Sequence, residues 1–361
     1  MASGSGWQTA GVAPEGNGFS YLQALERAAL INTESGGADL AGKTHRFEPE
    51  LVYYSFGPHP PALRVNPGDR IVSSTVDARN WDRNGEQIPT PMRQPSPGTR
   101  LHEGNPQVGP FYVEGAEPGD TLIVRILGIE LNRDWGWSAL TPGFGGLVVE
   151  TRLNGPHGLN DPLPESFYRW ELDRRRMVGR LELPESRLGA IEVPLGPFLG
   201  CLGVAPRHGQ VILSMAPAEH GGNMDCPDVC VGTTVYFPVF VQGACLFFGD
   251  VHAAQGDGEI GGSAVETTAD VTVEVDLIKG KEIRWPRLED AESIMVIGST
   301  RPLIDAFRIA HVELIDWLVE EHGFDRLEAL QAVTQVGTAR VGNVVDPNYS
   351  VVARYPKKFL P

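Results

Sequence analysis

The sequence contains few cysteines, no apolar run of membrane-spanning length and no recognisable leader segment. Four cysteines occur among the 361 residues, and these are Cys201, Cys226, Cys230 and Cys245. A membrane-spanning helix needs about 20 predominantly apolar residues, and no run in this chain approaches that length. The first residues lack the basic and apolar regions of a signal peptide. We therefore expect a cytoplasmic protein with reduced thiols and no membrane partner.

Positive charge is scarce in this chain. Lys and Arg together number 30, against 46 for Asp and Glu, so the formal net charge is −16 at pH 7. A chain of this charge repels the phosphates of nucleic acids, which we therefore exclude as expected partners. Neutral ligands and metal cations are favoured instead.

The signatures of covalent hydrolases are also missing. No Gly-x-Ser-x-Gly elbow is present, and no serine lies in the glycine-rich Ser-Ser-Lys context of the serine amidases. Cys245 lies inside an apolar segment, where we expect a buried and unreactive thiol. Cys226 and Cys230 are spaced like a metal-binding pair, but no second Cys or His pair at the spacing of a zinc ribbon accompanies them. We therefore expect neither a serine nor a cysteine nucleophile.

Glycine and proline are abundant, with 43 and 29 residues, and this favours turns and short strands over long helices. Acidic and apolar residues alternate over residues 267–278, as they do in a half-exposed strand. Beyond residue 300 the apolar spacing becomes helical and predicts one helix from Leu303 to about Gly323 and a second over residues 327–336. The sequence therefore predicts a mainly β fold, with a β-sandwich-like body, short helices and an α-helical C-terminal portion.

Two parts of the chain differ in their sequence patterns. Residues 1–45 are predicted to be a flexible N-terminal extension with a short helix near residues 21–30. Residues 46–361 are predicted to form one domain that is mainly β to about residue 280 and helical from about residue 300.

Two short segments combine acidic side chains, a histidine and several glycines. They supply the candidate site residues Glu219, His220, Asn223, Asp225, Asp250, His252, Gln255 and Glu259. A strand-like segment, residues 235–241, connects the two, and residues 239–248 read as a buried strand that leads into the second, glycine-rich loop. Carboxylates and imidazoles are ligands for hard and borderline metal ions, and glycine allows close backbone approach. We expect one metal site; the alternative is a pair of acidic turns between strands.

These motifs resemble those of the acetamidase/formamidase family. The resemblance rests on Glu-His-Gly-Gly-Asn-x-Asp at 219–225, Tyr-Phe-Pro-Val-x-Val-x-Gly-Ala at 236–244, Gly-Asp-x-His-x-x-Gln-Gly-Asp-Gly-Glu-Ile at 249–260 and Gly-Pro-Phe-Tyr-Val-Glu-Gly-Ala-Glu-Pro-Gly-Asp at 109–120. It covers the chain from about residue 50 to the C-terminus. It implies a metal-dependent amide hydrolase with the same mainly β fold.

Amide hydrolysis at neutral pH needs a strong nucleophile and stabilisation of an oxyanion, and a bound divalent metal supplies both. Five residues are predicted as metal ligands, with His220 and Asp225 as alternatives for one position: Asp77, His220, Asp225, Asp250 and His252. Asp77 is included because it follows a predicted strand and precedes a loop. Zinc is the expected metal, and calcium is the alternative.

The remaining candidates have roles in catalysis and substrate binding. Glu259 is the predicted general base because its glycine neighbours allow close approach, and Glu219 is the second candidate. The neutral amides of Asn223 and Gln255 are suited to bind an amide substrate or the oxyanion. Trp135 and Trp137 lie in an unusual glycine-rich segment, where they either form a wall of the substrate pocket or fill space beneath a loop.

The predicted function is hydrolysis of a small linear amide, of the formamide or acetamide type, to the carboxylate and ammonia. One alternative is the same scaffold acting on a larger amide or a cyclic imide. The other is a non-catalytic, calcium-stabilised β-sandwich that binds a partner. An all-oxygen shell would favour calcium, whereas His252 or His220 in the shell would favour zinc. We also expect a homodimer or a higher homo-oligomer.

Overall fold

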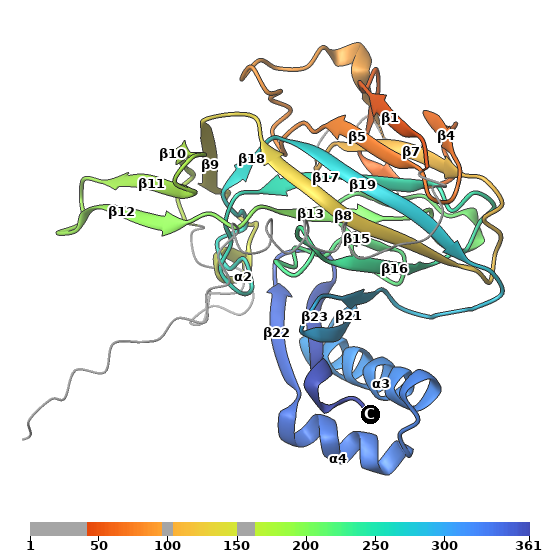
Figure 1. The fold of residues 1–361 in the computed structure, drawn as a ribbon. Coiled ribbons are helices and arrows are strands. Elements are labelled where there is room, and N and C mark those ends of the chain that lie inside the picture. The colour runs from red at the N-terminus through yellow and green to blue at the C-terminus, as the bar shows by residue number, and fades with distance from the viewer. Residues whose placement is uncertain (1–41, 96–103, 150–162) are drawn as a thin grey trace, which may run out of the picture.

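The structure is a computed structural model that describes residues 42–95, 104–149 and 163–361 (Figure 1). Most of the predicted N-terminal extension, including the helix predicted near residues 21–30, lies outside the described residues. Two large sheets and a C-terminal pair of helices make up the described chain. The prediction of a mainly β fold is therefore confirmed.

The first large sheet has nine strands in the described chain. In spatial order they are β1 (Thr44–Phe47), β5 (Arg70–Ser74), β19 (Ala269–Ile278), β8 (Thr121–Leu131), β16 (Thr234–Pro238), β20 (Arg287–Glu289), β21 (Ser293–Thr300), β23 (Tyr349–Pro356) and β22 (Thr338–Asn343). Buried and half-buried residues alternate along most of β19, as its sequence predicts, so one face of this sheet packs against the core.

The second large sheet has twelve strands among the described residues. Nine follow one another as β12 (Gly189–Pro194), β11 (Val178–Leu183), β10 (Ser166–Asp173), β9 (Trp135–Leu140), β18 (Glu266–Thr267), β17 (Leu246–His252), β7 (Gln107–Val113), β2 (Val52–Tyr53) and β6 (Arg93–Gln94). The other three are β13 (Phe198–Gly203), which pairs with β17 and with β15 (Gly221–Asn223), and β4 (Leu63–Val65), which pairs with β7.

The remaining elements are short. Strands β3 (Ser55–Phe56) and β14 (Ile212–Leu213) pair with each other. Helix α2 (Gly146–Val149) and the 3-10 helices η1 (Thr90–Met92), η2 (Arg207–Gly209) and η3 (Lys357–Phe359) lie in the connections.

The two large sheets share one hydrophobic core. Ile129 and Val273 contribute to it from the first sheet, and Phe111, Leu202 and Phe248 contribute from the second. The arrangement is that of a β-sandwich, in which side chains from two facing sheets interdigitate. Every residue of β17 is buried, so this strand lies at the centre of the body.

The C-terminal portion packs on one end of the first sheet (Figure 1). Helix α3 (Leu303–His322) ends at Gly323, whose φ of 71° is the left-handed conformation that glycine adopts readily. Helix α4 (Arg326–Val336) begins at Asp325, whose carboxylate accepts hydrogen bonds from two backbone amides. Strands β22 and β23 follow the helices, and the prediction of a helical portion did not include them.

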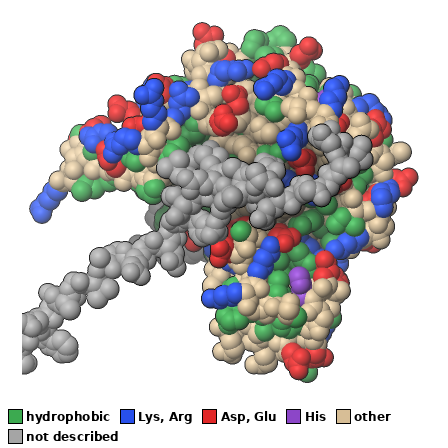
Figure 2. Space-filling view, in the orientation of Figure 1, with side chains coloured by type: hydrophobic (Ala, Val, Ile, Leu, Met, Phe, Trp, Pro, Cys, Tyr) green, Lys and Arg blue, Asp and Glu red, His purple; other side chains and the backbone are tan. Residues whose placement is uncertain are grey.

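Two further observations concern the distribution of surface charge and the character of the helices. On the face shown in Figure 2, acidic and basic side chains are interspersed. None of the helices in the described part of the chain combines enough length with enough apolar character for a membrane crossing.

Candidate functional site

Buried acidic side chains gather around one histidine near the end of β17. Strand β17 carries Asp250 and His252, so these residues lie within the strand and not in the loop predicted after it. Glu266 of β18 stands directly opposite His252 in the sheet. Asp225 follows β15, and Glu259 lies in the loop after β17. No more than 8% of the surface of any of these residues is exposed.

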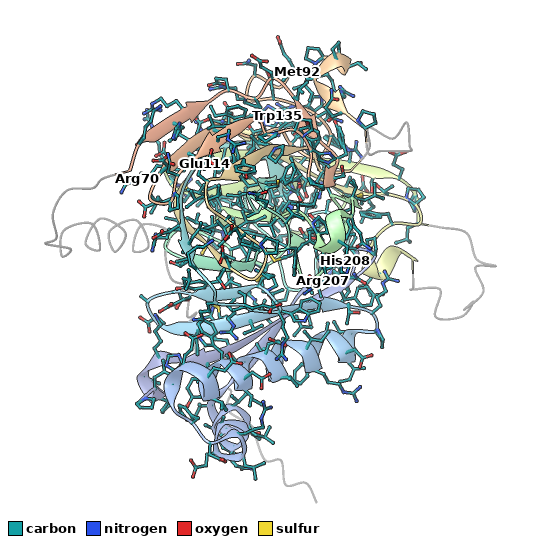
Figure 3. The ribbon with its side chains drawn as sticks, turned by 90° about the vertical axis from the view of Figure 1, so that its right-hand side faces the viewer. Arg70, Met92, Glu114, Trp135, Arg207 and His208 are labelled. Atoms are coloured by element: carbon teal, nitrogen blue, oxygen red, sulfur yellow. The ribbon has the colours of Figure 1, made fainter. Side chains whose placement is uncertain are left out.

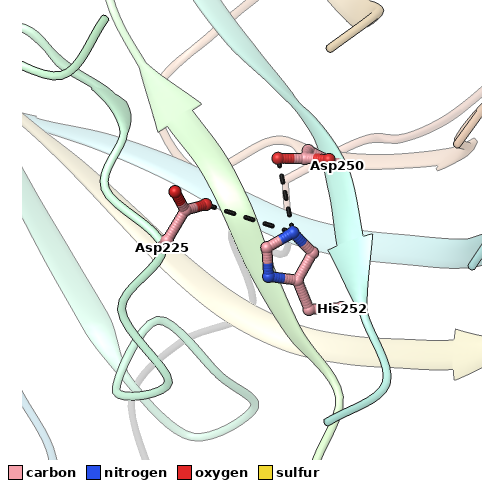
Figure 4. Close-up of side chains that lie close together, drawn as sticks. All are labelled: Asp225, Asp250 and His252. Atoms are coloured by element: carbon pink, nitrogen blue, oxygen red, sulfur yellow. Dashed lines mark ion pairs between the residues drawn. The ribbon is translucent and has the colours of Figure 1, made fainter. Parts of the chain in front are cut away.

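His252 is the centre of the cluster. Its Nε2 lies 3.5 Å from Asp250 Oδ2 and 4.0 Å from Asp225 Oδ1 (Figure 4). The same nitrogen lies 3.4 Å from Glu266 Oε1. The ligand atoms of Asp225, Asp250 and His252 lie within 4.8 Å of one another, as do those of His252, Glu259 and Glu266. His252 therefore belongs to two overlapping sets that could each hold a metal ion.

Three acids of this cluster have a strained backbone conformation. Asp225, Asp250 and Glu259 have φ values of 45°, 55° and 47°, in the left-handed region that non-glycine residues rarely adopt. Such conformations persist where surrounding structure imposes them, and they are frequent at functional sites. Gly200 of β13 lies next to the cluster, and a Cβ at this position would come within 2.8 Å of Asp250 Oδ2 and 2.9 Å of Asp225 Oδ1. The space between the carboxylates is therefore kept open by a glycine.

Gln255 determines which ring nitrogen of His252 carries the proton. It thereby leaves the nitrogen that faces the carboxylates free to act as an acceptor. Its Nε2 donates to the backbone carbonyl oxygens of Asp225 (2.8 Å) and Gly342 (3.0 Å). Its Oε1 therefore faces His252 Nδ1, at 2.8 Å, and can only accept a hydrogen bond. The proton on Nδ1 leaves the Nε2 lone pair available to a cation, as in many histidine metal ligands. We propose a positioning role for Gln255 in place of the predicted substrate contact.

The side-chain amide of Asn223 is also engaged in hydrogen bonds within the cluster. Its Nδ2 donates to Asp225 Oδ2 (2.9 Å) and to Asp346 Oδ2 (2.8 Å). Its Oδ1 accepts from Asn105 Nδ2 at 2.8 Å, and the same Asn105 nitrogen lies 2.7 Å from Asp250 Oδ2. Because both ends of the Asn223 amide are engaged, we propose that it orients carboxylates and does not bind substrate.

The cluster concentrates more negative charge than its protein partners neutralise. Five carboxylates are buried around one imidazole, and these are Asp225, Asp250, Glu259, Glu266 and Asp346. Burial raises the pKa of four of them, Asp225, Glu259, Glu266 and Asp346, well above the usual range. Burial lowers the pKa of His252, but the charges of Glu266 and Asp250 outweigh that effect and raise it.

Three carboxylate oxygens in this cluster have no hydrogen-bond partner within the described part of the chain: Asp225 Oδ1, Asp250 Oδ1 and Glu266 Oε2. A buried charge without a partner is strongly destabilising, so these oxygens fit a cation. Since the set also contains an imidazole nitrogen, it suits zinc or another transition metal better than calcium.

Asp77, predicted as a ligand, is engaged elsewhere. Its Oδ2 accepts from Arg133 Nη2 (2.7 Å) and from Trp137 Nε1 (3.0 Å), and its Oδ1 accepts from the backbone amides of Arg79 and Trp81. Burial raises the pKa of Asp77, and the Arg133 charge opposes that shift. We propose that Asp77 forms a structural ion pair and is not a metal ligand.

His220 and Glu219 also lie outside the two ligand sets. The His220 ring is fully buried, lies 5.2 Å from the Phe56 ring, and has no hydrogen-bond partner for either nitrogen among the described residues. Burial lowers its pKa to about 3, so the ring is neutral. Glu219 is half-buried in a tight turn between Ala218 and Gly221. We therefore propose that neither residue belongs to the site.

Trp135 and Trp137 both make edge contacts with the Trp81 ring. Trp135 lies in the β body (Figure 3). Trp135 contacts two guanidinium groups, with its ring centre 3.7 Å from Arg133 Cζ and 4.2 Å from Arg169 Cζ. Trp137 is buried, stands opposite Glu266 in the sheet and stacks on Phe167 at 5.9 Å. These contacts favour the interpretation that both tryptophans fill space beneath a loop.

A pocket of about 520 Å³ opens beside the carboxylate cluster. Gln255 and Glu259 form part of its wall, so Glu259 borders both the pocket and the cluster. Trp170 of β10 also lines the pocket, whereas Trp135 and Trp137 are not among its described lining residues. We therefore propose that Trp170, and not Trp135 or Trp137, forms a wall of the substrate pocket.

The cysteines do not form a second reactive centre. All four are free thiols, and Cys245 is buried as expected. Burial raises the pKa of the Cys245 thiol to about 11 and that of the Cys201 thiol well above its usual range. Thiolates are therefore disfavoured at both positions.

Three members of the cluster were missed in the sequence, namely Glu266, Asp346 and Asn105. Each lies outside the sequence motifs. Glu266 is brought to the site by pairing of β18 with β17, whereas Asp346 and Asn105 are connected to it by hydrogen bonds. For Glu266 the sequence held one usable signal, because this acid follows the apolar residues Ala264 and Val265 and directly precedes the strand predicted at residues 267–278. An acid in such a position is rarely buried unless it has a partner.

Known proteins resemble the chain in sequence. The sequence model of the Acetamidase/Formamidase family matches residues 53–213 and 209–358. The acetamidase of Mycolicibacterium smegmatis is 30% identical over 221 residues, which cover 48% of this chain and 53% of that protein. The formamidase of Methylophilus methylotrophus is 30% identical over 285 residues, which cover 66% of this chain and 65% of that protein. The chain thus spans about half to two thirds of the length of these curated relatives.

The fold is also found among solved structures. The crystal structure of an acetamidase from Yersinia enterocolitica matches with a TM-score of 0.77 and 38% sequence identity, over 94% of this chain and 99% of that chain. The resemblance seen in the sequence motifs is therefore confirmed at the level of both sequence and fold. The chain belongs to the acetamidase/formamidase family.

Proposed function

We propose that the protein hydrolyses a small linear amide, of the formamide or acetamide type, to a carboxylate and ammonia at the cluster around His252. The observation that carries this proposal is the set of buried, unpartnered carboxylate oxygens beside a histidine nitrogen, next to an open pocket. The names of the relatives, acetamidase and formamidase, support the same chemistry.

A divalent metal ion is part of the proposal. Asp225, Asp250 and His252 are the residues that would hold it, with Glu266 beside them, and the imidazole nitrogen favours zinc. When bound, such an ion polarises the amide carbonyl and lowers the pKa of a bound water. The same imidazole argues against the non-catalytic, calcium-stabilised module.

Glu259 is the proposed general base. It borders the pocket on one side and the carboxylate cluster on the other, so its carboxylate is within reach of both substrate and nucleophile. Burial and the charge of Asp225 raise its pKa. A carboxylate with a raised pKa accepts a proton from the attacking water more readily and can return it to the departing nitrogen.

The pocket volume favours a second candidate substrate class. At about 520 Å³, the pocket falls within the range of about 300–1,000 Å³ that is typical of sites for larger ligands. Trp170, Val193 and Val265 give it apolar walls. A longer acyl chain or a cyclic amide would use these walls, whereas formamide would leave them uncovered.

Ammonia release over a series of linear amides of increasing chain length tests both candidates. Because Trp170 lines the pocket, Trp170→Phe should raise kcat/KM for hexanamide relative to acetamide by about tenfold or more. Trp135→Phe is the matched control, and it should leave this ratio unchanged. Absence of ammonia release from every amide would refute the proposed function, and equal ratios in wild type and Trp170→Phe would refute the pocket assignment.

A further inference from the structure

Strand β12 is an edge strand in a hairpin that projects from the body (Figure 1). Among the described residues it pairs with β11 alone. An unpaired edge presents backbone donors and acceptors with which another strand can pair, and many proteins block such edges with lysines or bulges. Strand β12 contains no lysine, and its register with β11 is unbroken. The edge is therefore open to a further strand.

The pairing with β11 determines which backbone groups of β12 face outward. Leu195 N donates to Met177 O at 2.9 Å, directly beyond the end of β12. Hydrogen-bonded pairs recur at every second residue of an antiparallel ladder, so the backbone groups of Ile191 point to β11. Those of Ala190 and Glu192 point away from it, and no described residue bonds to them.

This part of the chain is nearly neutral, although the protein as a whole is acidic. Residues 166–194 contain six basic and five acidic side chains, whereas the formal net charge of the chain is −16. The charged side chain on β12, Glu192, has its carboxylate oxygens 3.7 Å from Arg180 Nη1 and 3.9 Å from Arg176 Nη2. Two copies of the chain therefore repel each other less at this edge than their net charge implies.

Apolar residues lead along the edge to the proposed substrate pocket. Leu188, directly before β12, is 65% exposed. Ile191 and Val193 are half-buried and lie on one face of the strand, because side chains alternate between the faces. Val193 and Pro194 line the pocket of about 520 Å³ beside the carboxylate cluster. A strand added at this edge would therefore lie beside the pocket.

We propose that two copies of this chain pair antiparallel through β12, with Ile191 opposite Ile191 of the partner subunit. In this register the outward backbone groups of Ala190 meet those of the partner's Glu192, and the reverse pair forms by the two-fold symmetry. Each Glu192 then lies opposite an alanine. The register centred on Glu192 would place two carboxylates opposite each other, which is unfavourable.

The proposed pair adds a residue to the pocket. Pro194 and Leu188 lie three residues on either side of Ile191, so Pro194 stands opposite Leu188 of the partner subunit. Residues opposite each other share a face of the sheet, and Pro194 lines the pocket. The partner's leucine therefore extends the apolar wall at the rim. This contribution to the pocket rests on the proposed function, whereas the pairing itself does not.

Ile191→Cys tests the pairing in the metal-loaded full chain. The Cα atoms of a non-hydrogen-bonded antiparallel pair lie about 4.5 Å apart, within the range of disulfides, so mild oxidation should join two copies. Wild-type protein should not cross-link, because none of its cysteines lies on β12. Glu182→Cys, on β11, is the matched control and should also remain a single chain. Cross-linking of Glu192→Cys in preference to Ile191→Cys would overturn the proposal.

Glu192→Pro and Glu192→Gln separate the backbone from the charge. Both remove the carboxylate, but proline also removes the outward N–H, which does not bond to β11. By symmetry two hydrogen bonds are lost, so Glu192→Pro should weaken association about tenfold or more in sedimentation. Glu192→Gln should associate like wild type. A wild-type protein that remains monomeric, or equal association of the two variants, would overturn the proposal.

Leu188→Ser tests the contribution to the pocket. It should lower kcat/KM for hexanamide relative to acetamide by about fourfold, the equivalent of one buried CH₂ group. Arg187→Ser, the neighbouring control, should leave the ratio unchanged. An unchanged ratio in a Leu188→Ser pair would overturn this contribution. Absence of ammonia release from every amide would instead refute the proposed function, and cross-linking through Ile191→Cys would still establish the pairing.

Discussion

Glu259→Gln should lower the turnover number by about 10²–10⁴-fold while leaving the metal content near that of the wild-type protein. Glutamine keeps the shape of the side chain but removes the basic oxygen that would accept a proton from the attacking water. Because Glu259 is buried among other carboxylates, loss of its charge relieves repulsion and should not unfold the chain. Ammonia-release kinetics, bound metal and thermal unfolding, measured on the same preparation, check this result.

Glu219→Gln is the matched control for that substitution. Glu219 was the second candidate base, but it lies half-buried in a turn outside both ligand sets. Its variant should retain wild-type turnover. Loss of metal from Glu259→Gln would instead make Glu259 a ligand, and full turnover in that variant would make it a residue without a role in catalysis.

His252→Ala should lose both the bound metal and the activity. Its Nε2 is the one imidazole nitrogen in the two overlapping ligand sets, and three carboxylate oxygens lie within 4.0 Å of it. Gln255→Leu should have a smaller effect of the same kind, because loss of a hydrogen-bond partner behind a metal ligand typically lowers metal affinity by about 10–100-fold. Metal titrations followed by ammonia release measure both changes.

His220→Leu separates this account from the ligand set predicted from the sequence. His220 is buried, and neither of its nitrogens has a partner in the described chain, so an apolar side chain of similar size should be tolerated. The variant should keep stoichiometric metal. Loss of metal from His220→Leu, with metal retained in His252→Ala, would reverse the assignment of the two histidines.

The fold could be predicted from the sequence to the extent that local patterns determine it. Alternation along residues 267–278 corresponds to β19, and the helical spacing after Leu303 and the glycine at position 323 correspond to α3 and its end. Strands β22 and β23 were missed because they follow two helices and are stabilised by pairing with each other and with β21. Such pairing leaves little trace in the local sequence.

The candidate site could be predicted only in part, for the same reason. Asp225, Asp250, His252 and Glu259 lie in two local motifs, and the structure brings all four together. Glu266 reaches the site only through pairing of β18 with β17, and Asp346 through a hydrogen bond to Asn223. Asp77 had the right chemistry for a ligand, but Arg133, which is distant in sequence, neutralises it.

The central claim is that the cluster around His252 holds a divalent cation on which amide hydrolysis depends. The most direct test measures bound metal and ammonia release on one preparation before chelation, after chelation and after addition of zinc. We expect metal and activity to be lost together and to return together, with Glu259→Gln regaining metal but not activity. Full ammonia release from rigorously metal-free protein would contradict the account.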